Sequence, residues 1–234
     1  CFFHYAVTAM LARVYCWAGE YGNAYKEAKE VVDATYSTGS TSTASCFNFS
    51  NSLTTNRKDY NSIIMTFFKS TCYEDYLPYM TKGNDVVLVV NTTNLFGDEA
   101  GADDRNLDLF GDWDGGDIKY SFKYDIKEGT SGTDMIPAIR LSEMYYIMGE
   151  YFAYKDEFSK AGEMLDKVRY ARGISTTNLA SSIGSLEVFH THLIKEMRRE
   201  FVGEGQMFFQ YKRLDQKPKD NVVFVFDKPN NEDI

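Results

Sequence analysis

The sequence has few residues of the types that build metal, redox or disulfide sites. Its 234 residues include four cysteines and three histidines. The cysteines stand at positions 1, 16, 46 and 72 and form no Cys-x-x-Cys pair, which argues against a zinc or dithiol redox site. Four cysteines allow three disulfide pairings, and the sequence does not choose among them. Buried free thiols are the simpler interpretation.

Positive charge is also in short supply. The 25 lysines and arginines face 34 aspartates and glutamates, which gives a formal net charge of −9 at pH 7 and an isoelectric point near 4.9. An acidic surface repels phosphate backbones, so we expect no nucleic-acid partner. The same charge disfavours electrostatic docking onto anionic lipid.

A long apolar run is missing as well. No stretch approaches the ~18 apolar residues of a membrane span. The opening residues, CFFHYAVTAMLARVY, are amphipathic and do not follow the basic-then-apolar order of a signal peptide. Cys1 leads directly into this predicted helix without a linker, so we do not expect it to carry a lipid. We expect instead that the chain lacks its natural N-terminus.

Periodic apolar residues predict a helical hairpin over residues 5–34. Its first stripe comprises Ala6, Met10, Val14 and Trp17, and its second comprises Ala24, Ala28, Val31 and Val32. The offsets match those of the tetratricopeptide repeat. In that arrangement small residues (Ala12, Ala24, Ala28) let two helices approach closely, and large ones (Leu11, Tyr15, Tyr21) fill the groove between them.

The same pattern returns over residues 140–172. One helix is predicted over about 139–154 and another over about 159–172, with Gly173 as the C-cap. Aromatic residues at helical spacing in the hairpins are predicted to fill the core. They are Tyr15, Tyr21, Tyr145, Phe152, Phe158, Phe208 and Phe209.

A charged helix is predicted within the first half of residues 186–215, with Gly205 as its stop. Its apolar residues recur at spacings of three and four: Leu186, Phe189, Leu193, Met197 and Phe201. Glu196, Glu200 and Glu204 are four apart and share one helix face. Arg199 lies close enough to the first two for ion pairing.

The three glutamates allow two interpretations. A glycosidase needs two carboxylates about 5–10 Å apart, which neighbours on a helix face can supply. Interleaved Lys195, Arg198 and Arg199 would instead favour the charged carboxylates, whereas a general acid must hold its proton. A structural ion-pair network is therefore the favoured interpretation.

Residues 36–137 separate the two hairpins as a long insert. Strands are predicted over residues 63–68, 85–90 and 118–126, and residues 221–226 predict a further short strand or an extended tail. Residues 96–117 are acidic and rich in glycine. A long insert in a repeat array often carries the binding site.

Several segments, in order, resemble the SusD/RagB family of glycan-binding outer-membrane lipoproteins of Bacteroidetes. The opening hairpin resembles "ALLARVYLYxGDYxxA". DDRNLDLF followed by KYSFKYD resembles "D-x-R-x-x-x-[TL]-F…KY". IRLSEMYYIMGE and DKVRYARG resemble "iRLAEvyLmrAE" and "N-x-[VI]-R-x-R-[AG]-G", with Asp166 in place of the Asn. The tail FDKPNNEDI resembles "PIPxxE".

The closing segment carries the most specific part of the resemblance. The family pattern is roughly E-R-x-x-E-[LF]-x-x-E-G-x-R-x-x-D-[LI]-x-R. The matching positions are Glu196, Arg199 or Arg198, Glu200, Phe201, Glu204, Gly205, Phe208 and Arg213. Three positions depart from it, Met197, Met207 and Gln210, and they suggest a divergent ion-pair network.

The resemblance implies a mainly α fold of tetratricopeptide-like helical hairpins with a long irregular insert carrying short β-strands. Family members are about twice as long, so we expect a single C-terminal region. Its parts would be a helical hairpin (1–35), the insert (36–137), further hairpins (138–216) and a tail (217–234). The resemblance also implies a surface-exposed lipoprotein of the cell outer membrane, whose anchor lies in the missing N-terminal part.

Aromatic residues of the insert are the predicted glycan site. Sugar rings present C–H faces that stack on flat side chains, while carboxylates bind hydroxyl groups, and Trp113 between Asp112 and Asp114 offers both. Glycan platforms from this insert are what the resemblance implies. A second cluster comprises Tyr73, Tyr76 and Tyr79. The alternative for Trp113 is that it packs back onto the repeats.

No metal site or cofactor is expected. Asp112, Asp114 and Asp117 alternate as calcium ligands do, but their spacing lacks the distant glutamate of the helix-loop-helix motif. A solvated acidic loop is favoured, and calcium stays open. His190 and His192 are two apart, so on a helix they point to different faces.

Two functional hypotheses follow, and neither needs a catalytic residue. The first is a non-catalytic protein that captures an oligosaccharide and delivers it to a TonB-dependent SusC-like transporter, with the glycan itself left open. The alternative is a tetratricopeptide-type adaptor that binds only protein. A glycosidase acting through Glu196 is a third, less favoured hypothesis.

Overall fold

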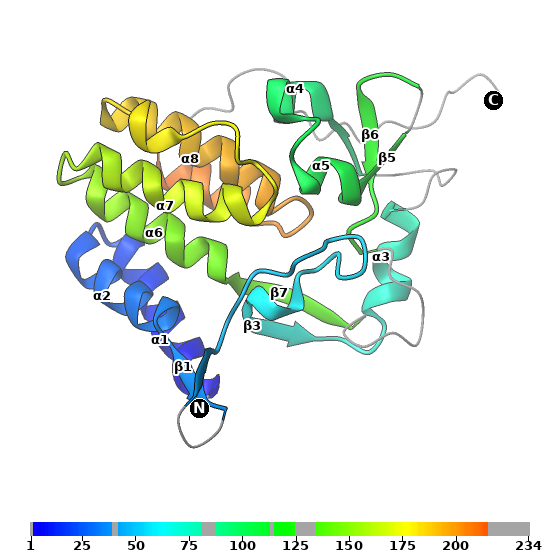
Figure 1. Cartoon of the computed structure of the whole chain (residues 1–234). Coiled ribbons are helices and arrows are strands. Elements are labelled where there is room, and N and C mark those ends of the chain that lie inside the picture. The colour runs from blue at the N-terminus through cyan, green and yellow to red at the C-terminus, as the bar shows by residue number, and fades with distance from the viewer. Residues whose placement is uncertain (1, 39–41, 81–87, 113–114, 125–133, 215–234) are drawn as a thin grey trace. The chain divides into compact units, whose positions relative to one another are not determined.

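The computed structural model describes five stretches of the chain: residues 2–38, 42–80, 88–112, 115–124 and 134–214 (Figure 1). The helices there are α1 (Phe2–Trp17), α2 (Tyr21–Val32), α3 (Cys72–Met80), α4 (Thr92–Phe96), α5 (Asp104–Leu109), α6 (Leu141–Ala153), α7 (Phe158–Ala171), α8 (Leu186–Glu200) and α9 (Met207–Arg213). The strands are β1 (Thr35–Ser37), β2 (Thr43–Ser45), β3 (Ile63–Phe68), β4 (Val89–Asn91), β5 (Phe110–Asp112), β6 (Ile118–Ser121) and β7 (Met135–Arg140). The predicted class, mainly helical with short strands in the insert, is confirmed.

The chain divides into two compact units. Unit 1 comprises Cys1–Asn51, Asp59–Thr66 and Pro137–Glu196, and unit 2 comprises Ser52–Lys58, Phe67–Ile136 and Met197–Ile234. A unit boundary falls inside β3, β7 and α8.

Unit 1 is built on the two predicted hairpins. α1 packs against α2, α2 against α6 and α6 against α7, so the four helices follow one another in a series (Figure 1). Ala12, Ala24 and Ala28 are fully buried, which confirms the close approach predicted for small residues. Around them the core gathers Ala9, Cys16, Val31, Ala34, Phe47, Ile64, Ile139, Leu141, Met144, Ile147 and Met148.

Helix α1 turns a different face inward from the predicted stripe. Ala9 and Cys16 are buried, whereas Val14 and Trp17 are 53% and 45% exposed. Leu11, predicted to fill the groove, is 40% exposed. The prediction was wrong because α1 is apolar on almost every side, so spacing alone did not select its buried face.

Helix α7 ends at the predicted left-handed glycine. Gly173 has φ +83°, its N–H donates to the carbonyl of Tyr170, and the N–H of Ile174 donates to the carbonyl of Arg169. These two bonds form the Schellman motif, which satisfies carbonyls left over at a helix end. The positive φ explains why glycine stands at this position.

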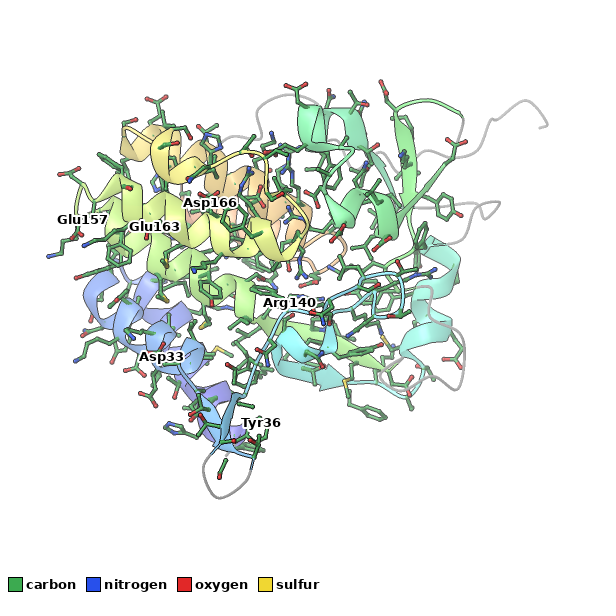
Figure 2. All side chains as sticks on the ribbon, viewed as in Figure 1. Asp33, Tyr36, Arg140, Glu157, Glu163 and Asp166 are labelled. Atoms are coloured by element: carbon green, nitrogen blue, oxygen red, sulfur yellow. The ribbon has the colours of Figure 1, made fainter. Side chains whose placement is uncertain are left out.

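The short 3₁₀ turn η3 (Leu179–Ser181) lies directly on α7. The backbone N–H groups of Leu179 and Ala180 donate to the buried Asp166 carboxylate at 2.8 and 3.1 Å. Asp166 is buried, whereas Glu163 on the same helix is exposed; Figure 2 labels both residues. A Cβ atom on Gly162 would lie 2.6 Å from the backbone N and Cα of Ala180, so this approach requires glycine.

Unit 2 carries a small antiparallel sheet of order β4-β6-β5. Val90 lies opposite Lys119, and Gly111 lies opposite Tyr120. β4 and β6 fall at the ends of two predicted strands, whose residues 85–87 and 125–126 lie outside the described residues. A second core includes residues of β4 and β5, and it comprises Leu53, Val90, Leu95, Phe96, Leu109, Phe110 and Val202.

Two further pairs of strands complete the sheets of the described residues. β3 coincides with the predicted strand over 63–68 and pairs with β7. β1 pairs with β2, with Tyr36 opposite Ala44. The predicted segment 221–226 lies outside the described residues.

The closing helix α8 forms as predicted but ends earlier. Its apolar residues Phe189, Leu193 and Met197 are buried. α8 ends at Glu200, well before Gly205. Phe208 and Phe209 are 71% and 51% exposed, so the prediction that they fill the core was wrong.

The reason for the two exposed phenylalanines is the geometry of α9. This separate seven-residue helix turns Met207 and Gln210 inward. Phe208 and Phe209 therefore point outward. Their rings meet edge to face, with the ring centroids 5.4 Å apart.

The cysteines within the described stretches are free thiols. Cys16 and Cys72 are buried and Cys46 is half-buried. The free-thiol interpretation is thus confirmed for these three, while Cys1 lies outside the described residues. As for membrane crossing, no helix in the described part of the chain has both the length and the apolar character that it requires.

Candidate functional site

The predicted binding tyrosines share one short helix of unit 2, α3. Tyr76 and Tyr79 are three residues apart and lie on the same side of it. Tyr76 is half-buried and Tyr79 is 48% exposed. Tyr73 stands one turn earlier, but its side chain lies outside the described part. α3 therefore places Tyr76 and Tyr79 next to each other.

The ring of Tyr76 is held by a stack. It lies nearly parallel to the ring of Tyr124, with centroids 4.7 Å apart and an angle of 15° between the planes. The ammonium group of buried Lys58 lies 5.1 Å from the centre of the Tyr124 ring and donates to the carbonyl of Met135 at 3.0 Å. A cation over an aromatic face is attractive, so buried neighbours fix the position of Tyr76.

Burial raises the pKa of the Tyr76 hydroxyl, chiefly by desolvation. The hydroxyl group therefore keeps its proton at neutral pH and can donate a hydrogen bond to a ligand. A half-buried ring with a polar tip suits a ligand that is apolar on one face and carries hydroxyl groups at its edge.

The acidic part of the predicted site is only partly described. Asp112 ends β5, is exposed, and accepts a hydrogen bond from the Gly115 N–H at 3.0 Å. Trp113 and Asp114 lie outside the described residues. Asp112 and the tyrosines thus belong to the same unit but to different elements, β5 and α3.

The possible calcium ligands already have protein donors in part. Asp117 accepts a hydrogen bond from the Thr93 hydroxyl at 2.6 Å, and Asp112 accepts one from Gly115. Among the described residues no group of three His, Cys, Asp or Glu side chains could hold a metal ion. Asp114, the third predicted ligand, is outside that part of the chain.

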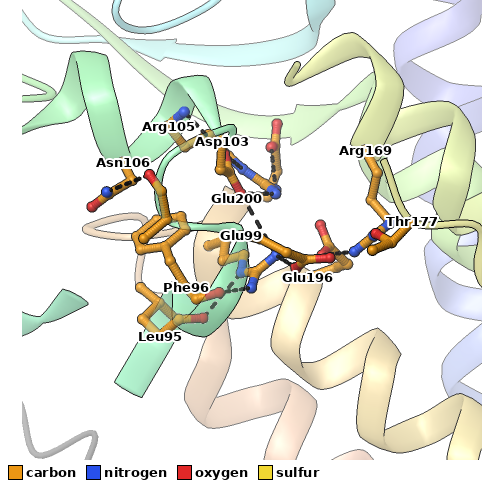
Figure 3. Close-up of polar contacts among 12 residues, drawn as sticks. Leu95, Phe96, Glu99, Asp103, Arg105, Asn106, Arg169, Thr177, Glu196 and Glu200 are labelled. Atoms are coloured by element: carbon orange, nitrogen blue, oxygen red, sulfur yellow. Dashed lines mark hydrogen bonds and ion pairs between the residues drawn. The ribbon is translucent and has the colours of Figure 1, made fainter. Parts of the chain in front are cut away.

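Residues from the signature segments meet in a buried charge network in unit 2 (Figure 3). The fully buried Arg199 donates to the carbonyls of Leu95 and Phe96 at 3.0 and 2.9 Å. It also donates to Glu99 at 2.7 Å and lies 3.6 Å from Asp103. One guanidinium group therefore ties α8 to α4 and to the turn that follows it.

Arg105 extends this network. Its Nε and Nη2 donate to the two carboxylate oxygens of Asp103 at 2.9 and 2.7 Å, and its Nη1 donates to Glu200 at 3.3 Å. Lys123 donates to the Glu204 carboxylate at 2.6 Å and to the Glu200 carbonyl at 2.9 Å. The unit 2 charge network, as we call it, comprises Glu99, Asp103, Arg105, Lys123, Arg199, Glu200 and Glu204.

The glutamate row predicted for α8 was wrong for its last member. Glu204 lies beyond the end of the helix and pairs with Lys123, while Glu200 pairs with Arg105. Glu196 belongs to unit 1, where it lies 3.2 Å from Arg169. An ion-pair network is present as predicted, but its described partners come from segments far away in the sequence.

Unit 1 contains its own buried pairs. Arg169 also lies 3.2 Å from Asp166 and donates to the Thr177 hydroxyl (Figure 3). Arg172 donates to Asp59 at 2.7 Å and lies over the Phe49 ring. Both are arginines of the DKVRYARG segment, and they bind helix α7 to its neighbours.

Sequence reasoning missed Lys58 and Tyr124 as supports of the candidate site. Tyr124 lies in the KYSFKYD segment, so its motif was noticed, but its contact with Tyr76 is set by the fold. Phe67 and Phe68 were missed as well. They precede α3 and are 58% and 73% exposed, which adds aromatic surface to the same unit.

Comparisons with known proteins give one consistent result. The family model described as SusD family matches residues 12–231. A comparison with curated proteins found no match.

Solved structures share the fold. A SusD superfamily protein from Bacteroides thetaiotaomicron is 24% identical, with a TM-score of 0.64 over 90% of this chain and 49% of its own. A SusD-like carbohydrate binding protein from Bacteroides vulgatus is 20% identical, with a TM-score of 0.58 over 90% of this chain and 45% of its own. A SusD superfamily protein from Bacteroides fragilis is 17% identical, with a TM-score of 0.63 over 88% and 46%. The chain therefore spans about half the length of these structures.

Proposed function

The chain belongs to the SusD family, and we propose that it forms part of a protein that captures an oligosaccharide at the cell surface. SusD family proteins are non-catalytic, and the proposed action is binding alone. The observation that carries the proposal is the family match over residues 12–231. The Bacteroides vulgatus structure is named as a carbohydrate binding protein, and we extend that role to this chain.

The proposed contact surface is the row on α3 together with the acidic end of β5. Tyr76 and Tyr79 would offer flat rings to the C–H faces of sugars, and Tyr73 would continue the row. Asp112 would accept hydrogen bonds from sugar hydroxyl groups, and so would Asp114 beside a stacking Trp113. Tyr76 carries most of this argument, because Tyr124 and Lys58 already fix its ring before a ligand arrives.

We further propose that the captured glycan passes to a TonB-dependent SusC-like transporter. The protein would then sit on the outside of the outer membrane as a lipoprotein. Family membership supports both statements. Genes encoding such a transporter beside the gene for this chain would agree with them.

The arrangement of the acids favours binding over hydrolysis. Glu200 and Glu204, two of the glutamates considered for catalysis, are buried and paired with Arg105 and Lys123. A glycosidase needs two carboxyl groups that reach the sugar, whereas these two are engaged in ion pairs inside the scaffold. Glu200 and Glu204 would therefore stabilise the scaffold.

A glycan array followed by calorimetry tests the proposal. We expect the chain to bind a neutral oligosaccharide, and we expect Tyr76→Ala and Trp113→Ala each to weaken binding about tenfold, the loss of one stacking contact of roughly 1.4 kcal/mol. Phe208→Ala is the matched control, because Phe208 is an exposed aromatic residue outside the proposed surface. It should leave the affinity unchanged.

Each adverse outcome has a separate meaning. If no glycan binds the chain or a longer form of it, capture is refuted and the protein-binding adaptor becomes the better hypothesis. If a glycan binds but Tyr76→Ala and Trp113→Ala retain full affinity, capture stands and the residue assignment is wrong.

A further inference from the structure

The ring of Tyr120 lies directly over a glycine of the neighbouring strand. In the sheet of unit 2, Tyr120 of β6 is opposite Gly111 of β5. A Cβ atom on Gly111 would lie 2.6 Å from Cε1 and Cζ of Tyr120 and 2.8 Å from its hydroxyl oxygen. Glycine within a strand often marks a place where another group comes close to the backbone. Gly111 therefore leaves the space that the Tyr120 ring occupies.

This ring lies on the face of the sheet that is turned away from the second core. Successive side chains of a strand point to opposite faces, and the next pair along the two strands is Phe110 with Ser121, both buried. Phe110 belongs to the second core. Tyr120 is half-buried, and within the described stretches its hydroxyl has no hydrogen-bond partner. The hydroxyl can therefore bond to a ligand.

Tyr120 is one end of a line of aromatic rings that leads to the candidate site. Its ring meets the Phe122 ring edge to face, with centroids 5.9 Å apart. The Arg57 guanidinium lies 4.5 Å from the centre of the Phe122 ring, so a cation covers one face of that ring. Two residues further along the chain, Tyr124 stacks on Tyr76. Every second residue from 120 to 124 is therefore aromatic.

Backbone hydrogen bonds join the two ends of this line. The Leu88 N–H donates to the carbonyl of Tyr79 in α3 at 2.8 Å. The Leu88 carbonyl in turn accepts from the N–H of Ser121 in β6 at 3.2 Å. Helix α3 and strand β6 are thus linked through one residue of unit 2, and Tyr120 is the neighbour of Ser121.

We propose that Tyr120 is a second contact point of the glycan surface, that Gly111 is its positioning residue, and that this surface takes an extended oligosaccharide. The inference rests on the proposed function. Residues 120 and 124 are up to about 13 Å apart along an extended chain, which is more than one sugar ring covers. A glycan that contacts both Tyr76 and Tyr120 must therefore consist of several units.

A purely structural role for the Tyr120 ring would have other consequences. A ring over a glycine can also shield the backbone of an edge strand, and β5 is at the edge of the order β4-β6-β5. Loss of such shielding would change stability and leave glycan affinity unaltered. Affinity and melting temperature are therefore measured on the same variants.

Calorimetry with glycans of two lengths tests the inference. The probes are the neutral oligosaccharide that binds best on the glycan array and the disaccharide cut from it. We expect Tyr120→Ala to weaken binding of the oligosaccharide about tenfold and to leave the affinity for the disaccharide, held at Tyr76, within error. Tyr170→Ala, which removes an exposed tyrosine of α7, is the matched control and should change neither affinity.

Gly111→Ala disturbs the ring while Tyr120 stays in place. The added methyl group meets the far end of a side chain that can move, so we expect the melting temperature to stay within error and affinity for the oligosaccharide to fall about fivefold. In a Tyr120→Ala background the same change should have no further effect on affinity, because no ring is left to displace. Gly101→Ala is the control, since nothing lies within 4 Å of its Cβ position.

The outcomes separate this inference from the proposed function. If Tyr76→Ala weakens binding while Tyr120→Ala and Gly111→Ala keep full affinity, the inference is overturned and the proposed function stands. If Tyr120→Ala weakens the disaccharide as much as the oligosaccharide, one subsite holds the whole glycan and the extended surface is refuted. If no glycan binds, both proposals fail.

Discussion

Replacing Arg199 with methionine is expected to lower the free energy of unfolding by about 3–5 kcal/mol, the usual cost of breaking a buried ion pair from one side. Methionine keeps most of the length of the side chain but removes all five donors. The carboxylates of Glu99 and Asp103 would lose a cation, and the carbonyls of Leu95 and Phe96 would lose their donor. Urea denaturation followed by circular dichroism measures the loss.

Two comparisons make this result specific to the buried network. Arg199→Lys keeps the charge without the planar fork and should fall between the parent and Arg199→Met. Lys160 on α7 forms an exposed pair with Glu157. Lys160→Met removes the cation of this pair and should give no measurable change in the free energy of unfolding. If Arg199→Met were as harmless as Lys160→Met, the network would not stabilise unit 2, and another role for the signature residues would be needed.

The helical hairpins could be predicted because their information is local. Spacings of three and four located α1, α2, α6 and α7 to within a few residues, and Gly173 marked the end of α7. The face that α1 buries could not be predicted, since apolar residues surround the helix. Only its packing partners distinguish Ala9 from Val14.

The partners of the charged residues could not be predicted from the sequence, for a related reason. The sequence places Glu196, Arg199 and Glu200 close together, which suggests that they pair with each other. In the folded chain Arg199 contacts Glu99, one hundred residues earlier, and Glu200 contacts Arg105. Burial decides this choice, because a buried ion needs a partner with matched geometry, which proximity in sequence does not supply.

The candidate site stays a prediction, and the sequence alone indicated its residue types but little of its arrangement. Tyr76 and Tyr79, three residues apart, lie on one side of α3 because it is a helix, although that helix was not predicted. Tyr124 supports Tyr76 across two segments of the insert, and no local sequence pattern predicts this contact. Motif resemblance performed better than periodicity here, since it drew attention to the KYSFKYD segment that contains Tyr124.

Replacing Gly162 with alanine is expected to destabilise unit 1 by about 2–3 kcal/mol, as overpacking in a well-packed core does. The added Cβ would lie 2.6 Å from backbone atoms of Leu179 and Ala180. η3 would have to move away, and the hydrogen bonds from its N–H groups to Asp166 would stretch. The higher helix propensity of alanine, worth up to ~1 kcal/mol, would offset only part of this loss.

The loss of stability on replacing a helical glycine with alanine should depend on the space around it, and two other glycines test this. At Gly149 a Cβ would meet the Phe189 ring at 3.2 Å, and a side chain can yield more readily than a backbone, so Gly149→Ala should cost less than Gly162→Ala. At Gly22 nothing lies within 4 Å, and Gly22→Ala should stabilise α2 by about 0.5 kcal/mol. Thermal and urea denaturation of the three variants measure the series. An order other than Gly162, Gly149, Gly22 would contradict the packing of η3 on α7.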